Sequence, residues 1–239
     1  MAGISCWLSL LIVFAVFFPT MVIAAENQAG YARDRLQMVD QQIVARGIKD
    51  TSVIEAMKKV PRHYFVPEGR RHLSYVDSPL PIGERQTISQ PYIVAFMTEV
   101  LKLNPEDRIL EIGTGSGYQA AILAELVKEV YTIEIIPSLG KKARKLLENM
   151  GYRNIFVKIG DGYKGWPGKA PFDAVIVTCA PENIPRALIE QLEDGGRLII
   201  PVGPAGTVQE LIMGVKIKDQ LKTESILPVI FVPMVRGKK

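Results

Sequence analysis

The feature that most constrains the fold is an alternation of short apolar runs and helical runs over residues 108–203. In chain order the runs are RILEIG, YQAAILAELV, EVYTIEI, LGKKARKLLENM, NIFVKIG, FDAVIVTCA, IPRALIEQL and GRLIIPVG. Strands that are apolar along nearly their whole length are typical of parallel sheets covered by helices on both faces. The pattern predicts an α/β fold with a doubly wound, mostly parallel sheet.

The two flanks of this region differ from it. After Gly203, VQELIMGVKIK and SILPVIFVPM are expected to form a closing antiparallel pair, whose order in the sheet the sequence does not fix. Before it, the helical spacing of Leu36, Val39, Ile43 and Val44 predicts a helix over residues 31–47 that ends at Gly47. A second helix, SVIEAMKKV, is expected to be capped by Asp50 or Thr51, and a third to begin at Pro91.

Composition favours one folded domain, residues 26–239, because no linker, repeat or charge block divides the chain. The net charge is +4, and the short basic cluster around Lys141 and Arg144 lies on a predicted helix. We interpret this cluster as a solvated face, so no nucleic-acid partner is expected. Cys6 and Cys179 are predicted to be free thiols, and no metal-binding motif is present.

Residues 1–25 are expected to be a hydrophobic signal or membrane-anchor segment. The stretch CWLSLLIVFAVFFPTMVIAA, Cys6–Ala25, carries no charge over roughly the length that crosses a bilayer. The basic residues that follow favour an anchor with the remaining chain in the cytoplasm. Export to the periplasm with cleavage after Ala24 stays open as an alternative. So does a misassigned start, with Met21 or Met38 as the first residue.

The first candidate site is the glycine turn in LEIGTGSGYQAA, between a predicted strand and a helix. Gly113, Gly115 and Gly117 let backbone N–H groups approach a ligand. Glu134 ends the next strand, 21 residues after Gly113, where an acid can accept hydrogen bonds from a ribose diol. The alternative is that the glycines only permit tight packing and Glu134 is a solvated strand end.

The details of the turn favour S-adenosylmethionine over a dinucleotide. Tyr118 stands where a dinucleotide fingerprint requires its third glycine. Glu111, two residues before the first glycine, repels phosphate but suits the ammonium of an amino-acid ligand. Asp161 and Gly162 follow a third strand, where Asp161 can accept from the adenine amine and Gly162 can leave room for the ring. These two residues are also consistent with an ordinary turn.

Five longer stretches carry a family resemblance: VPRHYFVP, LPIGERQTISQPYIVAFMTEVL, ILEIGTGSGYQAA, GDGYKGWPGKAPFDAVIVTCAPENIP and LEDGGRLIIPVG. Together they resemble the protein-L-isoaspartate O-methyltransferase family. The resemblance extends from about residue 37 to residue 235, and QTISQP is its most specific motif. The apolar N-terminal segment departs from the family, whose members are usually soluble and cytoplasmic.

The resemblance implies a Rossmann-like class I methyltransferase. Nothing in the sequence demands an oligomer, so a monomer is expected. It would transfer a methyl group from S-adenosylmethionine to the free α-carboxylate of L-isoaspartyl residues, with D-aspartyl residues as a second substrate. Its partners would be age-damaged proteins and peptides, whose repair it initiates. The motif assigns substrate binding to Thr87, Ile88 and Ser89, with Ser89 as the catalytic residue. A carboxylate with a pKa of about 4 is ionised at neutral pH, so no general base is needed.

Other interpretations stay open at this level. Ser89 could simply cap the helix that begins near Pro91. A class I methyltransferase acting on a small molecule or RNA would keep the cofactor residues without needing QTISQP. A membrane-tethered binding protein could keep the fold without turnover. The two histidines, His63 and His72, are interpreted as structural or surface residues, and Cys179 as a small core residue.

Overall fold

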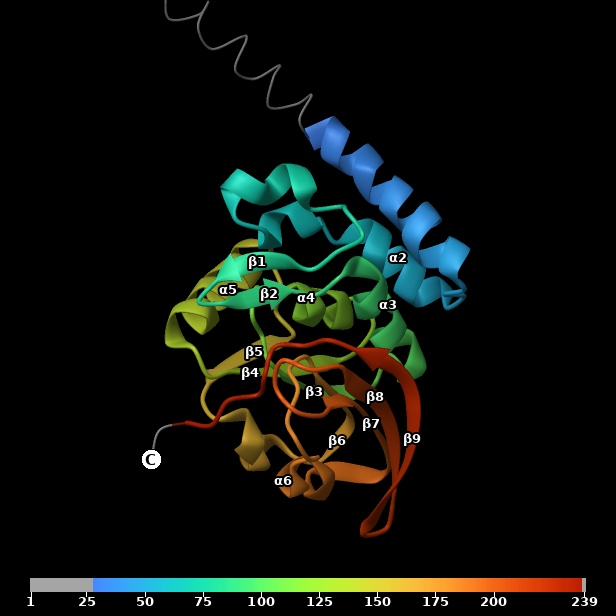
Figure 1. Ribbon diagram of the computed structural model, residues 1–239, viewed down its shortest axis with the longest axis vertical. Helices are drawn as coiled ribbons and strands as arrows, with labels where there is room; N and C mark the ends of the chain where they lie inside the picture. Colours follow the sequence, from blue (N-terminus) through green and yellow to red (C-terminus); the bar gives the residue numbers. More distant parts are fainter. Residues whose placement is uncertain (1–27, 238–239) are drawn as a thin grey trace, which may run out of the picture.

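The computed structural model describes residues 28–237 and is built around a seven-stranded sheet (Figure 1). The strands lie in the order β5-β4-β3-β6-β7-β8-β9. Their bounds are β3 (Arg108–Ile112), β4 (Glu129–Glu134), β5 (Ile155–Ile159), β6 (Phe172–Val177), β7 (Leu192–Val202), β8 (Gln209–Ile217) and β9 (Gln220–Val229).

The predicted sheet topology is confirmed. Strands β5, β4, β3, β6 and β7 pair in parallel, and β7 pairs with β8 and β8 with β9 in antiparallel fashion. The chain runs outward from β3 through β4 to β5 and then returns to β6 on the other side of β3. This reversal makes a crevice at the carboxyl ends of β3 and β6, which is where doubly wound sheets bind ligands.

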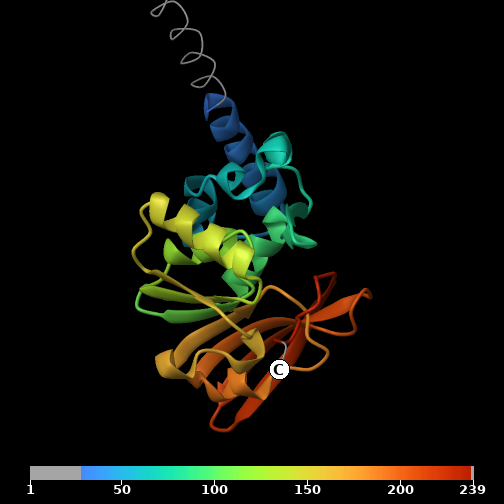
Figure 2. The ribbon, with the colours of Figure 1, turned by 90° about the vertical axis from the view of Figure 1, so that its left-hand side faces the viewer.

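Helices cover both faces of the sheet (Figure 2). Helices α3 (Pro91–Val100), α4 (Tyr118–Ala124) and α5 (Pro137–Asn149) pack on one face. The other face carries α6 (Arg186–Glu190) and the short turns η5 (Gly162–Lys164) and η6 (Pro167–Lys169). In β3, Ile109 belongs to the first core and Leu110 and Ile112 to the second. This alternation explains why the strand is apolar throughout.

The N-terminal helix ends at Gly47 as predicted, but two of its apolar residues are exposed instead of buried. Residues 28–38 are α-helical and continue into a π turn, η1 (Val39–Ile43), and a 3-10 turn, η2 (Val44–Arg46). Gly47 closes the helix in the left-handed conformation, at φ 97°. Leu36 and Val44, expected on the apolar face with Val39 and Ile43, are 52% and 41% exposed. The π turn explains the difference, because its extra residue rotates the faces on either side.

The second predicted helix is confirmed with its cap. Helix α2 (Thr51–Lys59) begins after Asp50, whose carboxylate accepts hydrogen bonds from the backbone N–H groups of Ser52 and Val53. The cap satisfies two of the free donors that every helix start presents.

A hairpin that the sequence did not predict lies beside the crevice. After η3 (Arg62–Phe65) and η4 (Glu68–Leu73), strands β1 (Leu80–Gly83) and β2 (Gln86–Ile88) pair in antiparallel fashion. The turn residues Glu84 and Arg85 adopt φ 50° and 58°. The two central positions of such turns usually hold Asn or Gly, and here only the preceding residue, Gly83 at φ 100°, is a glycine. The hairpin carries Thr87 and Ile88 over the end of the sheet.

Within residues 28–237, no helix combines the length and the apolarity that a bilayer crossing needs. The predicted segment Cys6–Ala25 lies outside the described residues.

Candidate active site

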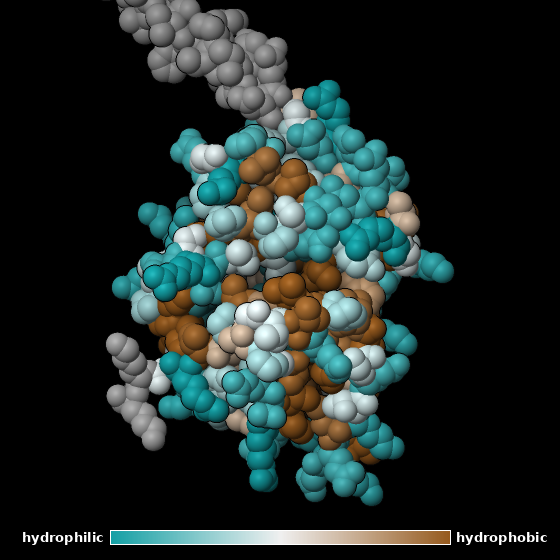
Figure 3. Space-filling model, in the orientation of Figure 1, coloured by the Kyte–Doolittle hydropathy of each residue, from teal (hydrophilic) through white to brown (hydrophobic). Residues whose placement is uncertain are grey.

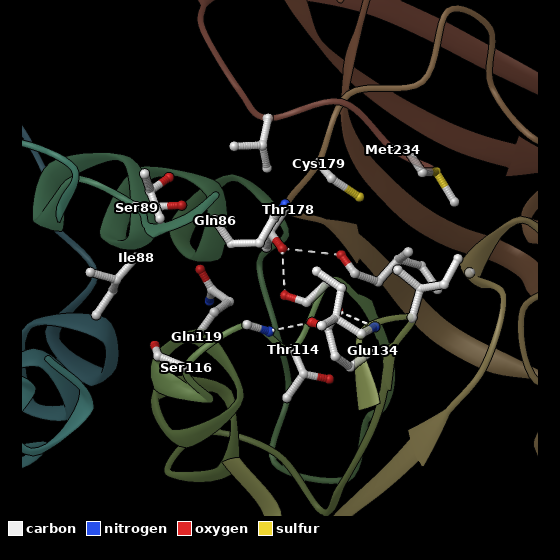
Figure 4. A pocket seen from close by; sticks show the side chains of 18 of the residues that line it. Gln86, Ile88, Ser89, Thr114, Ser116, Gln119, Glu134, Thr178, Cys179 and Met234 are labelled. Atoms are coloured by element: carbon white, nitrogen blue, oxygen red, sulfur yellow. Dashed lines mark hydrogen bonds between the residues drawn. The ribbon is translucent and has the colours of Figure 1, made fainter. Parts of the chain in front are cut away.

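A cavity lies at the carboxyl ends of β3, β4 and β6, in the crevice where the strand order reverses (Figure 4). The glycine turn, the end of β4, the hairpin and the C-terminal tail each contribute part of its wall. The lining residues that the argument uses are Thr87, Ile88, Ser89, Gly113, Gly115, Glu134, Gly162, Thr178 and Val232. Seven of the ten sequence-predicted site residues therefore come together here, and Glu111, Gly117 and Asp161 are not in the wall.

The glycine turn is shaped by contacts that exclude side chains. Gly113, Gly115 and Gly117 have φ of 100°, 52° and 90°, in the left-handed region that favours glycine. A Cβ atom on Gly113 would lie 2.5 Å from the Thr178 hydroxyl oxygen. That hydroxyl donates a hydrogen bond of 2.7 Å to the Gly113 carbonyl. The turn is therefore fixed against the end of β6.

Glu134 is held at the bottom of the cavity by two backbone donors. One carboxylate oxygen accepts from the Gly115 N–H at 2.7 Å, and the other accepts from the Ile136 N–H at 2.9 Å. Its residue is only 5% exposed. A carboxylate has about four lone-pair sites, so each oxygen can accept a second donor from a ligand.

Glu111 lies beneath the cavity instead of in its wall. It is fully buried, and within residues 28–237 neither of its carboxylate oxygens has a hydrogen-bond partner. Burial raises the pKa of Glu111 to about 8, and the negative charge of the Glu134 carboxylate adds to the rise. The side chains of a strand alternate, and in β3 it is the neighbouring Ile112 that lines the cavity.

Asp161, Gly117 and Gly162 make contacts that stabilise the local structure. The Asp161 carboxylate accepts from the Tyr163 N–H at 2.9 Å and from the Gly237 N–H at 3.2 Å, so it caps η5 and holds the C-terminal tail. Gly117 is the N-cap of α4, where a Cβ would lie 3.2 Å from Leu147. Gly162 does line the cavity, and its Cβ would lie 2.4 Å from Ile112.

Ser89 stands between this cavity and a neighbouring groove. The groove is bordered by α3, by the end of β9 and by the tail, and four residues line both spaces: Thr87, Ser89, Thr178 and Val232. The N-cap of α3 is Gln90, without a side-chain cap, so the capping role considered for Ser89 is not the one that the structure shows. In Figure 4, Ser89 and Ile88 lie on the opposite side of the labelled residues from Glu134 and Met234.

The sequence interpretation missed the contributions of β6 and of the tail. Thr178 directly follows β6, a position that the strand-end rule identifies once the strand order is known. Residues 232–235 line the cavity although no motif marked them. The groove has an apolar rim, in which Val208 and Ile230 are 62% and 77% exposed. Apolar side chains also gather across the middle of the face seen in Figure 3.

Neither histidine lines the cavity or the groove. His63 is buried, and its Nδ1 lies 2.7 Å from the Tyr75 hydroxyl. Burial, together with Arg35 and Arg71, lowers the pKa of His63 to about 4, so its ring is neutral at physiological pH. His72 is exposed. Cys179 has a free thiol that lines the cavity, and burial raises its pKa to about 12.

Comparison with known proteins gives a consistent result. Residues 33–239 match the family model described as Protein-L-isoaspartate(D-aspartate) O-methyltransferase (PCMT). The chain is 50% identical over 222 residues to the protein-L-isoaspartate O-methyltransferase of Opitutus terrae, with 91% of this chain and 95% of that one covered. The Gloeobacter violaceus protein of the same name is 53% identical over 201 residues, covering 84% and 98%.

Solved structures agree with these relatives. A structure named protein-L-isoaspartate O-methyltransferase has a TM-score of 0.76 at 27% identity, covering 84% of this chain and 65% of that one. A second, from Plasmodium falciparum, has a TM-score of 0.74 at 23% identity and covers 85% and 99%. That putative protein-L-isoaspartate O-methyltransferase was solved in complex with S-adenosyl-L-homocysteine. The predicted fold class and family are thus confirmed, and the chain belongs to the protein-L-isoaspartate(D-aspartate) O-methyltransferase family.

Proposed function

We propose that each of the two adjoining spaces, the cavity and the groove, binds one of the two substrates of a single reaction. The chain is a protein-L-isoaspartate(D-aspartate) O-methyltransferase, which methylates isoaspartyl residues and so initiates their repair. Its methyl donor is S-adenosylmethionine. In our proposal the cavity at the glycine turn holds the donor, and the neighbouring groove holds the isoaspartyl segment of a damaged protein.

The observation that carries this proposal is the boundary shared by the two spaces. Thr87, Ser89, Thr178 and Val232 line both of them. A carboxylate oxygen must meet the donor methyl in line, so the two substrates have to touch at one place. Correct alignment alone can contribute as much as ~7–11 kcal/mol to lowering the barrier. Ser89 lies at the boundary where that alignment is needed.

The residues of the cavity suit an adenosyl ligand with an amino-acid end. Glu134 is fixed by two backbone donors and can accept further bonds from ribose hydroxyls. Gly113, Gly115 and Gly162 bring backbone to the wall, and Gly117 shapes the turn by starting α4. In our proposal the ammonium of the bound donor favours the ionised form of Glu111 beneath the cavity, whose pKa is about 8 in the free protein. Asp161 acts by holding the tail that closes one side.

Substrate binding is assigned to the hairpin and to the start of α3. The donor, when bound, supplies an activated methyl group. The hydroxyls of Thr87 and Ser89 can each donate a hydrogen bond to the isoaspartyl carboxylate, and Ile88 packs beneath them with 4% exposure. Pro91 begins α3 directly after this segment, and the positive end of a helix favours an anion. No proton needs to be removed, because the carboxylate is already ionised.

The product chemistry explains how methylation leads to repair. Transfer converts the free α-carboxylate to a methyl ester, whose carbonyl is attacked by the backbone nitrogen of the next residue. Methanol leaves and a succinimide ring forms. Water then opens the ring to normal or isoaspartyl linkages, so repeated cycles favour repair.

The direct test is tritiated methyl transfer from S-adenosylmethionine to an isoaspartyl peptide beside its normal aspartyl twin. We expect label only in the isoaspartyl peptide, as a base-labile methyl ester. The family match favours this acceptor over a small molecule or RNA. Absence of label from the isoaspartyl peptide with retained donor binding would contradict the proposal and support a binding protein without turnover.

Location and assembly are also proposals. We propose that the catalytic domain faces the cytoplasm, tethered through residues 6–25, because Arg33, Arg35 and Arg46 follow that segment. A C-terminal reporter active only in the periplasm should be silent, and strong activity would mean export. We propose a monomer, since one chain builds both spaces. Light scattering coupled to size-exclusion chromatography would test this proposal.

A further inference from the structure

Arg62 is a fully buried arginine whose guanidinium connects the N-terminal region to the active site. It lies in η3 with no exposed surface. Its Nε donates to the Ser74 carbonyl at 2.8 Å, and its Nη2 donates to the Ser89 carbonyl at 2.7 Å. The guanidinium carbon also lies 4.9 Å from the centre of the Tyr118 ring, and Tyr118 lines the cavity.

The charge of Arg62 has no counter-ion within residues 28–237. None of the ion pairs there includes it, and its Nη1 is buried without a partner. Burial lowers the pKa of Arg62 to about 10, so the side chain is still cationic at neutral pH. An uncompensated buried cation is costly, and apolar side chains fill such positions more cheaply. Packing alone therefore does not account for an arginine at this position.

Arg62 lies where its guanidinium can orient Ser89. The Ser89 carbonyl is fixed by the guanidinium, and in a trans peptide this also fixes the direction of the following N–H group, that of Gln90. The guanidinium therefore orients Ser89 at the boundary of the two spaces, through the backbone carbonyl of Ser89. The substrate brings a carboxylate to that boundary, which places a negative charge on the far side of Ser89 from the cation.

We propose that Arg62 is a positioning residue for methyl transfer, which orients Ser89 through its carbonyl and supplies a buried positive charge behind the substrate carboxylate. This inference rests on the proposed role of Ser89. Arginine suits both tasks, because its planar fork reaches two carbonyls at once, whereas a lysine ammonium is a point charge on a flexible chain. The two tasks can be separated by substitution.

Kinetics of Arg62→Lys and Arg62→Met provide the test, with an isoaspartyl peptide as acceptor. Lysine keeps the charge and loses the fork, so kcat should fall about ten-fold while KM changes by less than about two-fold. Methionine loses both, so KM should rise about ten-fold in addition. The dissociation constant of S-adenosylhomocysteine should stay within about two-fold in both variants. Arg197→Met is the matched control, since Arg197 pairs with the buried Asp107 away from both spaces.

A double-mutant cycle with Ser89→Ala shows whether Arg62 acts through Ser89. In the Ser89→Ala background, Arg62→Lys should lower kcat by less than roughly two-fold, since the residue that it orients has lost its hydroxyl. Full additivity in the cycle, or wild-type kinetics for the folded Arg62→Lys protein, would overturn the proposal. If Ser89→Ala itself has wild-type kinetics, the proposed function of Ser89 fails instead, so the two failures are distinguishable.

Discussion

The carboxylate of Glu134 accepts a hydrogen bond of 2.7 Å from the backbone N–H of Gly115, which joins the end of β4 to the glycine turn after β3. The same carboxylate accepts from the Ile136 N–H, so the acid is oriented before any ligand arrives. Preorganised acceptors lose less entropy on binding. The two sequence motifs, 21 residues apart for Gly113 and Glu134, therefore form one structural unit.

Removing this carboxylate should weaken donor binding. Glu134→Ala deletes a charged acceptor for ribose hydroxyls, and we expect a loss of roughly 1–3 kcal/mol in S-adenosylmethionine binding. Calorimetric titration measures it directly. Glu129→Ala, at the opposite end of the same strand, is the control and should bind normally. An unchanged dissociation constant for a folded Glu134→Ala protein would contradict the assignment of Glu134 as the acceptor for the ribose hydroxyls.

A side chain at Gly113 should distort the glycine turn. A Cβ there lies 2.5 Å from the Thr178 hydroxyl oxygen, so Gly113→Ala should abolish S-adenosylhomocysteine binding and lower the melting temperature. Gly47→Ala is the matched control: its φ of 97° is close to the 100° of Gly113, but nothing lies within 4 Å of the new atom. The control should share only the backbone strain, of about 1–2 kcal/mol. Equal donor affinity in both variants would contradict this account of the turn.

Glu111 should make stability depend on pH. Its pKa is raised from 4.5 to about 8, so between these values the folded protein holds a proton that the unfolded chain has released. The free energy of unfolding contributed by Glu111 must then fall as pH rises from about 4.5 to 8. His63 acts in the opposite sense between about 4 and 6.5, because its folded pKa is lowered.

The comparison with Glu111→Gln isolates this contribution, since His63 is present in both proteins. Urea unfolding without ligand at pH 5, 6.5 and 8 should show wild-type stability falling relative to the variant. Parallel pH profiles for the two proteins would show that Glu111 ionises normally in the folded state.

The sequence predicted the parallel core because each strand there is buried on both faces and is therefore apolar throughout, as in β3 and β6. It predicted Glu134 at a strand end because the spacing from the glycine turn is set by one helix and one strand. It did not predict the β1–β2 hairpin, whose turn residues Glu84 and Arg85 have positive φ without being Asn or Gly.

Other parts of the site depend on contacts between distant segments. Thr178 reaches the Gly113 carbonyl only because β3 and β6 are neighbours in the sheet. The Asp161 carboxylate binds the backbone of Gly237, 76 residues away. Glu111 was expected beside the ligand, but the alternation along β3 directs Ile112 to the cavity instead. Sequence spacing identifies strand ends, whereas the face to which each side chain points follows from register.

The central claim is that Ser89 helps to hold the isoaspartyl carboxylate at the boundary of the two spaces. Its most direct test is kcat/KM for an isoaspartyl peptide with Ser89→Ala, beside Ser225→Ala as an exposed serine on β9. We expect Ser89→Ala to lose at least about ten-fold, or about 1.4 kcal/mol, with donor affinity and melting temperature nearly unchanged, and Ser225→Ala to match the wild type. Methylation by Ser89→Ala at the wild-type rate would contradict the claim.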